Sequence, residues 1–332
     1  MQYGGCSMKE ILRLFPEMFR RSIQKNIAKR WSSLQEIRFR LQQPIELVFD
    51  QHVEWMKHLK PNQQDAQFIL NQLSNFSLYR MEDELREGYI TIEGGHRVGL
   101  AGKVNTRGGQ VKAIKDVTFL NIRIAKESIG IAQSILPYIY DKDYCNTLLI
   151  GAPQTGKTTL IRDMARIVAT GEKMIRPKKV GVIDERSEIA ASINGVPQHQ
   201  LGYRTDVMDA CPKAEGMMMM IRSMSPEVLV VDEIGSYDDV QALLEAINAG
   251  VTIFCTIHGR SLEELKNRPT LQAIFQQRAF DRFVILHAYP QPGAVQAIYN
   301  AREKNIFLQA RRLSNEMAWS TSYHKYNNMD RL

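Results

Sequence analysis

The sequence predicts an α/β protein in which a smaller α+β N-terminal domain precedes a C-terminal domain with a mostly parallel sheet. In the second half of the chain, short apolar runs alternate with helix-like stretches at the pace of β-α-β units, which predicts parallel strands. In the first half, strand-like runs meet at turn signals such as Gly94-Gly95, which is typical of hairpins.

We place the N-terminal domain at residues 1–128 and the C-terminal domain at residues 129–300. A chain of 332 residues is long enough for two domains. Residues 301–332 are polar and contain few aliphatic side chains, so we expect an appendage or a frayed, flexible tail.

The N-terminal domain should combine helices with hairpin strands. Apolar residues recur at helical spacing over residues 9–30, and a second helix is expected over residues 66–76. The expected strands are a pair within residues 33–48 that breaks at Pro44, the hairpin arms 88–93 and 96–104, and a strand at 117–125. A helix over residues 130–140 would lead into the C-terminal domain.

The C-terminal domain should contain at least five strands, at residues 147–150, 180–183, 228–231, 251–256 and 282–287. We expect helices over residues 159–166 and 214–224, and a third over 239–248 that Gly250 closes.

The composition is that of an ordinary globular protein, with 44% hydrophobic and 24% charged residues. No run approaches the roughly 18 apolar residues of a membrane span, and the first residues carry no apolar signal segment. The cysteines are scattered without a C-x-x-C pair, so we expect neither a zinc site nor a disulfide framework. We therefore expect a cytoplasmic protein.

The net charge of +7 raises the question of a nucleic-acid partner. Lysine and arginine are spread along the chain, and no basic run is interleaved with the aromatic residues that stack on bases. We expect no nucleic acid, and instead a solvated surface or one that meets acidic lipid or a protein partner.

Residues 151–158 match the P-loop pattern G-x-x-x-x-G-K-[ST] between an expected strand and an expected helix. The glycines let backbone N–H groups face a phosphate, and the start of the helix adds its positive dipole end. Lys157 would reach the β- and γ-phosphates, and the Thr158 hydroxyl would bind Mg²⁺. We expect ATP to be held by Gly151, Ala152, Pro153, Gln154, Thr155, Gly156, Lys157, Thr158 and Thr159.

A Walker B pattern follows later in the chain, where four apolar residues end in Asp232-Glu233. Asp232 would hold Mg²⁺, directly or through water, and a nearby glutamate would orient or deprotonate the attacking water. Because ligands bind at the carboxyl ends of parallel strands, this position favours a role in the site.

A second acidic segment, Asp184-Glu185, also follows a strand, and Glu188 adds a further carboxylate. Glu185 competes with Glu233 for the role of base. Asp184 could instead have a structural role, either as a helix-type cap or in a salt bridge to Arg186.

His258 lies at the end of the fourth strand. A lone histidine is commonly a satisfied core residue, but this position favours a sensor that hydrogen-bonds the γ-phosphate.

Four motifs occur in the same order in the bacterial type II/IV secretion ATPases, and the chain resembles that family. They are the P-loop, the acidic segment 180–188, the Walker B strand preceded by Arg222-x-x-x-Pro226, and the pair Thr256-x-His258. The resemblance extends to about residue 300 and points to a member from endospore-forming bacteria. It implies a RecA-like core and adds Arg222 to the candidate catalytic residues, which are Lys157, Glu185, Glu233, His258 and Arg222.

The resemblance implies a homo-hexameric ring that hydrolyses ATP and powers a membrane-associated channel or secretion complex during endospore formation. Its partners would be integral membrane proteins of that complex, so the protein would lie at the inner face of a membrane through a partner.

The resemblance also implies that the nucleotide lies between the two domains and that N-terminal arginines reach its phosphates. Strand alternation places Arg38 and Arg40 on one face, with Ile37, Phe39 and Leu41 on the other. The same alternation puts Arg123 opposite aliphatic residues, and Arg97 follows the hairpin turn. Arginines on a sheet face can instead be solvated, so both interpretations stay open for Arg38, Arg40, Arg97 and Arg123.

The chain departs from the family pattern at two places. The family carries Gly-Glu at Walker B where this chain has Asp232-Glu233, so the division of roles between Glu233 and Glu185 stays open. The longer histidine motif of the family is only partly matched around His258. The alternatives are a nucleic-acid-dependent motor on the same core and a non-hydrolysing, nucleotide-dependent scaffold.

Overall fold

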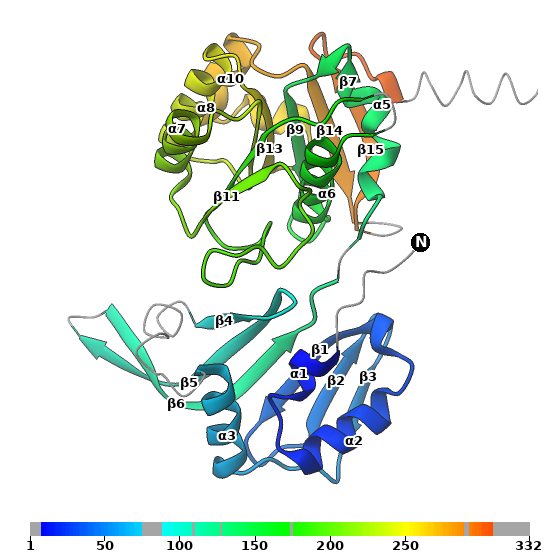
Figure 1. Ribbon diagram of the computed structural model, residues 1–332, viewed down its shortest axis with the longest axis vertical. Helices are drawn as coiled ribbons and strands as arrows, with labels where there is room; N and C mark the ends of the chain where they lie inside the picture. Colours follow the sequence, from blue (N-terminus) through cyan, green and yellow to red (C-terminus); the bar gives the residue numbers. More distant parts are fainter. Residues whose placement is uncertain are drawn as a thin grey trace, which may run out of the picture. The chain divides into compact units, whose positions relative to one another are not determined.

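The computed structural model describes residues 8–74, 88–107, 110–126, 128–172, 175–288 and 292–307. Contacts divide the chain into two compact units, one of residues 1–127 with 191–199 and one of residues 128–190 with 200–332 (Figure 1). The prediction for the appendage at 301–332 concerns a segment of which only residues 301–307 are described.

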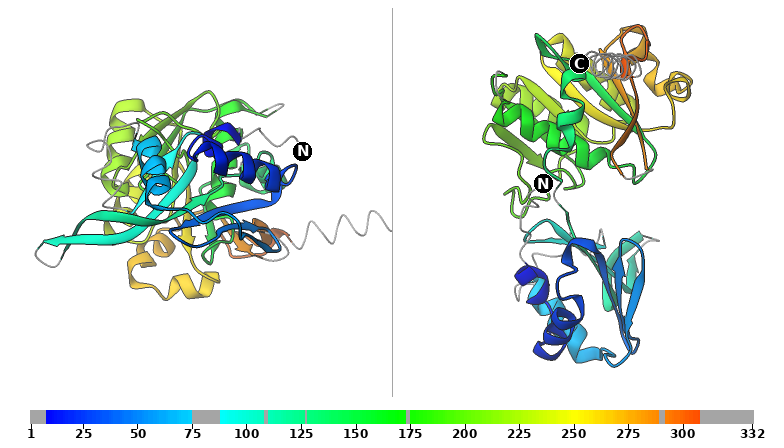
Figure 2. Two further views of the ribbon diagram at one scale, coloured as in Figure 1. Left: turned by 90° about the horizontal axis from the view of Figure 1, so that it is seen from below. Right: turned by 90° about the vertical axis from the view of Figure 1, so that its right-hand side faces the viewer.

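The N-terminal unit is an antiparallel sheet with helices packed on one face (Figure 2). Its strands, in the order β3-β2-β1-β6-β5-β4, are β1 Leu34–Arg40, β2 Ile45–Phe49, β3 Val53–Met56, β4 Tyr89–Ile92, β5 His96–Arg107 and β6 Gln110–Arg123. Its helices are α1 Met8–Leu12, α2 Glu17–Ile27 and α3 Gln63–Ser74, with a 3-10 turn at Trp31–Ser33. Alternate strand residues such as Ile37 and Phe39 are fully buried under these helices, which leaves the arginines of β1 on the other face.

The helical signal over residues 9–30 belongs to two helices that are separated at Pro16. Pro16 immediately precedes α2 and has a φ of −53°. Proline has no N–H to donate and disfavours a helical conformation in the residue before it, so α1 ends at Leu12 and α2 begins anew.

β5 and β6 continue beyond their neighbours as a two-stranded ribbon (Figure 2). β4 pairs with residues 96–99 of β5, and β1 pairs with residues 119–123 of β6. β5 and β6 pair with each other as far as Arg107 and Gln110. The strand expected at residues 117–125 is therefore the last part of a strand of 14 residues.

The C-terminal unit contains a seven-stranded sheet in the order β11-β10-β12-β13-β9-β14-β15. All neighbours in it are parallel except β15, which pairs antiparallel with β14 at the edge. These strands are β9 Thr147–Gly151, β10 Val180–Asp184, β11 Thr205–Asp209, β12 Val228–Val231, β13 Thr252–His258, β14 Arg282–His287 and β15 Ala294–Asn300. The mostly parallel sheet of the prediction is confirmed.

The helices of this unit are α5 Leu136–Ile139, α6 Lys157–Thr170, α7 Lys213–Met224, α8 Tyr237–Asn248, α9 Leu262–Lys266 and α10 Gln272–Gln276. Short elements complete the unit, namely the 3-10 turns Ile131–Ser134 and Pro269–Leu271 and the small pair β7 Tyr140–Asp141 and β8 Asp143–Tyr144. The helix expected over residues 130–140 is thus split into a 3-10 turn and α5, which begins at Leu136-Pro137 because proline favours the first turn of a helix.

Helices cover both faces of the parallel sheet (Figure 1). Leu148 and Ile150 of β9 pack in the apolar cluster that includes α7 and α8, whereas Leu149 packs in the cluster that includes α6. Burial on both faces explains why these strands read as unbroken apolar runs. In the described part of the chain, no helix combines the length and the apolar character needed to cross a bilayer.

Candidate functional site

The P-loop forms the turn between β9 and α6, as the sequence predicts. Gly156 caps α6 with a φ of +83°, a conformation that a residue with a Cβ adopts only with strain. At Gly151, a Cβ would lie 2.3 Å from Thr155 Oγ1, so this position also requires glycine. Both glycines of the motif are therefore needed to shape the turn.

A segment from the end of the sheet closes one side of this turn. The backbone N–H of Gly293, between β14 and β15, donates to the carbonyl oxygen of Thr155 at 2.7 Å. A Cβ on Gly156 would come within 2.6 Å of that same nitrogen. The shape of the P-loop thus depends on a residue far away in the sequence.

The Lys157 side chain is buried, with 6% of the residue exposed, and its ammonium group has three partners. Nζ lies 3.0 Å from the carbonyl oxygens of Gly151 and Ala152 and 3.0 Å from Nδ1 of His258. Burial lowers the pKa of Lys157, while the carboxylates of nearby acidic residues act in the opposite direction. The ammonium is therefore held inside the turn by groups that a phosphate could replace.

Asp232 follows β12 and connects two neighbouring elements. Thr158 Oγ1, in the first turn of α6, donates to Asp232 Oδ2 at 2.7 Å. Thr256 Oγ1, on the adjacent strand β13, donates to Asp232 Oδ1. The same Thr256 oxygen accepts the backbone N–H of Glu233 at 2.8 Å, and Thr256 is fully buried. These contacts fix the carboxylate at the start of the P-loop helix.

Glu233 is the next residue, and its backbone has a φ of +57°, which is unusual for a residue with a side chain. Its carboxylate has a partner at each oxygen: His258 Nε2 lies 2.8 Å from Oε1, and Arg186 Nη1 lies 2.6 Å from Oε2. His258 is not a core histidine, since its side chain is 39% exposed and bridges Glu233 to Lys157.

The loop after β10 is organised by Asp184, which is 1% exposed. Its carboxylate accepts the backbone N–H groups of Glu188 and Ala190, both at 2.8 Å, and burial raises its pKa. Arg162 of α6 donates to the carbonyl oxygens of Ile189 and Glu188 at 2.7 and 2.6 Å. Asp184 therefore caps backbone N–H groups of a loop and not of a helix, and Arg186 pairs with Glu233.

The two other carboxylates of the acidic segment differ in their surroundings, although both line a small pocket next to the P-loop cavity. Glu185 forms an ion pair with Lys213 of α7 and lies in a small neighbouring pocket. Glu188 lines this pocket and also the cavity at the P-loop, and its charge acts on Lys157. The sequence singled out Glu185 as a candidate base, whereas Glu188 is the carboxylate of this segment in the P-loop cavity.

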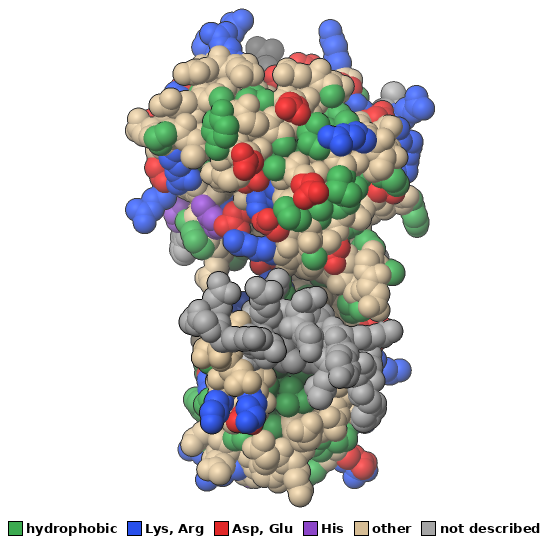
Figure 3. All heavy atoms as spheres, turned by 90° about the vertical axis from the view of Figure 1, so that its left-hand side faces the viewer, with side chains coloured by type: hydrophobic (Ala, Val, Ile, Leu, Met, Phe, Trp, Pro, Cys, Tyr) green, Lys and Arg blue, Asp and Glu red, His purple; other side chains and the backbone are tan. Residues whose placement is uncertain are grey.

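The cavity has a volume of about 400 Å³ and lies at the carboxyl ends of the neighbouring strands β9, β13 and β12. Its lining residues are Pro153, Gln154, Gly156, Lys157, Thr158, Thr159, Arg186, Glu188, Asp232, Glu233, His258 and Pro292. Acidic, basic and histidine side chains are mixed on the face of the C-terminal unit drawn in Figure 3.

The remaining candidates lie outside this cavity. Arg222 is exposed in the last turn of α7. In the N-terminal unit, Arg38 and Arg123 contact Glu36, at 2.8 and 3.6 Å, and Arg40 contacts Glu46 at 2.5 Å. The Arg97 guanidinium lies over the ring of Tyr89, 4.2 Å from its centroid.

The residues at the P-loop are of the types that hold a magnesium nucleotide. The hydroxyl of Thr158 and the carboxylate of Asp232 supply hard oxygen ligands, and the turn supplies backbone N–H groups and one ammonium group. Among the described residues, no group of three or more His, Cys, Asp or Glu side chains could hold a metal by itself. This donor set fits an ion that is also bound by phosphate oxygens.

The sequence interpretation missed Arg186, Glu188 and Pro292 as site residues. The signal for Glu188 was the spacing Asp184-x-x-x-Glu188, in which a buried carboxylate caps the backbone N–H of the second acid. Pro292 carried no signal, because its position depends on how β14 and β15 pair.

Comparisons with known proteins identify relatives over almost the whole chain. A family model described as sporulation stage III, protein AA, matches residues 7–306. Stage III sporulation protein AA of Bacillus subtilis (strain 168) is 50% identical over 293 residues, which is 88% of this chain and 95% of that protein.

Solved structures with a similar fold include two bacterial ATPases. The pilus retraction motor PilT, crystallised with bound ADP, has a TM-score of 0.57 at 14% identity, over 92% of this chain and 89% of its own. The ATPase DotB of Legionella pneumophila has a TM-score of 0.54 at 13% identity, over 86% of this chain and 78% of its own. These likenesses concern the fold alone, and they confirm the predicted α/β fold of a P-loop protein with a mostly parallel sheet. The family model and the Bacillus relative show that the chain belongs to the sporulation stage III protein AA family.

Proposed function

We propose that the chain is an Mg²⁺-dependent ATPase that works as a hexameric ring motor and powers a membrane-associated channel or secretion complex during endospore formation. The observation that carries the proposal is the meeting of Lys157, Thr158, Asp232, Glu233 and His258 at one cavity. Lys157 and Thr158 lie in the first turn of α6, Asp232 and Glu233 follow β12, and His258 ends β13, so the fold itself assembles the site.

Each of these residues has a role in phosphoryl transfer to water. Lys157 would leave the carbonyl oxygens of Gly151 and Ala152 to bind the β- and γ-phosphates, which carry more negative charge. Thr158 and Asp232 would hold Mg²⁺, which supplies charge neutralisation at the phosphate oxygens. Since phosphoryl transfer needs positioning and charge more than covalent chemistry, these three residues would supply the lysine charge and the metal ligands that hydrolysis requires.

The carboxylate that orients the attacking water is drawn from Glu188 and Glu233, which both line the cavity. Glu185 was the sequence candidate from the same segment as Glu188, and its pairing with Lys213 in the neighbouring pocket makes it the weaker choice. His258 bridges Lys157 and Glu233. It would thereby transmit the presence of a γ-phosphate from Lys157 to Glu233.

The assembly is proposed by analogy with the family. Arg38, Arg40, Arg97 and Arg123 would contribute positive charge to the phosphates in the ring, and Arg222 would act at the same interface. Integral membrane proteins of a sporulation channel or secretion complex would be the partners that receive the movement. A domain division near residue 128 would let the two parts move against each other.

The experiment that tests the enzymatic proposal is phosphate release by the purified chain with ATP and Mg²⁺, compared with Lys157→Ala. We expect turnover that needs Mg²⁺ and is lost in the variant. Binding of nucleotide without any phosphate release would instead indicate a non-hydrolysing scaffold. Turnover that appears only with added DNA would indicate a nucleic-acid-dependent motor.

The ring is tested separately by light scattering with and without Mg²⁺-nucleotide. We expect a sixfold mass in at least one of these states. A monomer at all concentrations in both states would contradict the ring, but would leave the ATPase proposal standing.

A further inference from the structure

Four side chains form a continuous chain of hydrogen bonds through the cavity. Lys157 Nζ lies 3.0 Å from Nδ1 of His258, His258 Nε2 lies 2.8 Å from Glu233, and Glu233 lies 2.6 Å from Arg186 Nη1. The chain therefore connects the P-loop lysine with the loop after β10.

The direction of these bonds follows from counting donors. A lysine ammonium has three N–H donors and no acceptor, and two of them point to the carbonyl oxygens of Gly151 and Ala152. The third must be given to His258, so Nδ1 accepts and Nε2 carries the hydrogen that Glu233 accepts. A phosphate that binds the ammonium group of Lys157 would therefore break the hydrogen bond between Lys157 and His258, at one end of this series of hydrogen bonds.

Arg186 is at the other end and has the means to respond. Its side chain is 61% exposed and lines the same cavity as Lys157 and Thr158. Hydrogen bonds fix the loop that carries Arg186. Asp184, before Arg186, accepts the backbone N–H groups of Glu188 and Ala190, after it. Arg162 donates to two carbonyl oxygens in the same stretch. The guanidinium can thus turn while its backbone stays in place.

We infer that Arg186 is a specificity-determining residue that distinguishes a nucleoside triphosphate from a diphosphate. In the structure its guanidinium is held by Glu233. With a triphosphate bound, Arg186 turns to the γ-phosphate, for which its planar fork is suited, and releases one carboxylate oxygen of Glu233 toward the cavity. This inference rests on the proposed function, because it assumes that the P-loop cavity takes a nucleotide.

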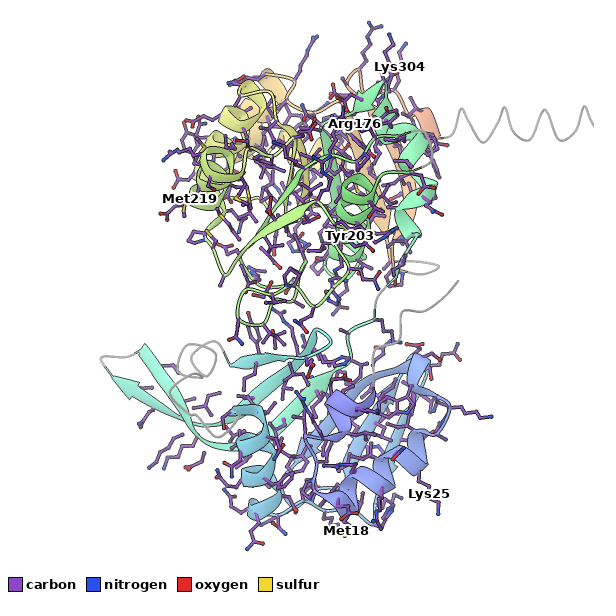
Figure 4. All side chains as sticks on the ribbon, viewed as in Figure 1. Met18, Lys25, Arg176, Tyr203, Met219 and Lys304 are labelled. Atoms are coloured by element: carbon purple, nitrogen blue, oxygen red, sulfur yellow. The ribbon has the colours of Figure 1, made fainter. Side chains whose placement is uncertain are left out.

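The test is a pair of fluorescence titrations in Mg²⁺, one with ADP and one with a non-hydrolysable ATP analogue. We expect Arg186→Gln to raise the dissociation constant of the ATP analogue by about tenfold or more, because only the analogue has a γ-phosphate. The dissociation constant of ADP should stay within about twofold of the wild-type value. Arg186→Lys keeps the charge but loses the fork, so its loss should be intermediate. Arg176→Gln is the matched control, because Arg176 is exposed before β10, at the opposite end of the sheet from the cavity (Figure 4).

Glu233→Gln provides a second readout with the opposite sign. It removes the charge that competes with the γ-phosphate for Arg186, so the preference for the analogue over ADP should rise. Circular dichroism of each variant establishes that it is folded before the titrations are compared.

Equal weakening of ADP and analogue by Arg186→Gln would show a structural role and overturn the inference, as would an unchanged preference. A wild-type chain that binds neither nucleotide would overturn the proposed function itself. The two failures are therefore distinguishable in one experiment.

Discussion

Thr158 Oγ1 donates a hydrogen bond to Asp232 Oδ2 at 2.7 Å, which joins the first turn of α6 to the end of β12. Both oxygens are hard ligands of the kind that Mg²⁺ prefers, and they lie on elements that the parallel sheet places side by side. The hydrogen bond thus holds two candidate ligands of the ion next to each other.

Asp232→Asn should lower the affinity for Mg²⁺ in the presence of nucleotide by about 10- to 100-fold, because an amide oxygen carries less charge than a carboxylate oxygen. A Mg²⁺ titration at fixed ADP measures this effect. Asp238→Asn is the control, since Asp238 is exposed in the first turn of α8 and does not line the cavity. An unchanged Mg²⁺ titration in Asp232→Asn would place the ion elsewhere.

Lys157→Ala should lower ATP turnover by at least about a hundredfold, because the only ammonium held inside the described P-loop turn is removed. The measurement is steady-state phosphate release. Lys304→Ala changes an exposed lysine near the end of the described chain and should leave turnover as it is (Figure 4). Retained activity in Lys157→Ala would count against the proposed mechanism.

The three carboxylate variants Glu185→Gln, Glu188→Gln and Glu233→Gln should differ in how much ATP turnover they lose, according to where each residue lies. We expect Glu188→Gln or Glu233→Gln to bind ATP and lose about 10²- to 10⁴-fold in turnover, because both line the cavity. Glu185→Gln should lose less, since it breaks the ion pair with Lys213. Single-turnover measurements test the order, and a full loss in Glu185→Gln alone would restore the sequence assignment.

The N-terminal unit should lose stability in mild acid because of His96, which is 1% exposed at the start of β5. Its Nδ1 accepts the backbone N–H of Ala125 at 2.9 Å, and burial lowers the pKa of His96 from 6.5 to about 4. The folded state therefore resists a proton that the unfolded chain binds near its ordinary pKa. The stability from this group is complete above pH 6.5 and falls by about 1.4 kcal/mol per pH unit as the pH drops toward 4.

Urea unfolding between pH 7.5 and 4.5 measures this slope. His96→Asn keeps an acceptor for Ala125 and has no group that titrates in this range, so its slope should be smaller by about one proton. Equal slopes for the two proteins would show that His96 is not the group that titrates.

Gly156→Ala should destabilise the C-terminal unit more than Gly250→Ala. Both glycines have a φ near +84°, so both substitutions cost about 1–2 kcal/mol of backbone strain. Around Gly250 the Cβ meets no atom within 4 Å, whereas at Gly156 it would lie 2.6 Å from Gly293 N. Thermal unfolding of the two variants isolates the contact with Gly293, and equal shifts would argue that this contact is absent in solution.

The sequence could predict the part of the site that is local or follows from parallel strands. The P-loop is contiguous, and Asp232 and His258 come directly after apolar strands whose carboxyl ends share one edge. Strand position alone was enough to bring them to Lys157 and Thr158.

The rest depends on the path of a loop, which periodicity does not describe. Glu185 and Glu188 follow the same strand, but Asp184 accepts the backbone N–H of Glu188, which lines the P-loop cavity, whereas Glu185 pairs with Lys213. The strands β11 and β15 also went unpredicted, because half-exposed strands at the sheet edges lack the unbroken apolar run of the central ones.

The hydrogen bond from Gly293 to Thr155 connects the segment between β14 and β15 to the P-loop turn. A movement of the P-loop turn on nucleotide binding or release would therefore also move Gly293 and the edge strand β15 that follows it. A shortened chain that stops before Gly293 would lose this hydrogen bond, so we expect it to bind nucleotide more weakly although every residue of the P-loop motif is still present.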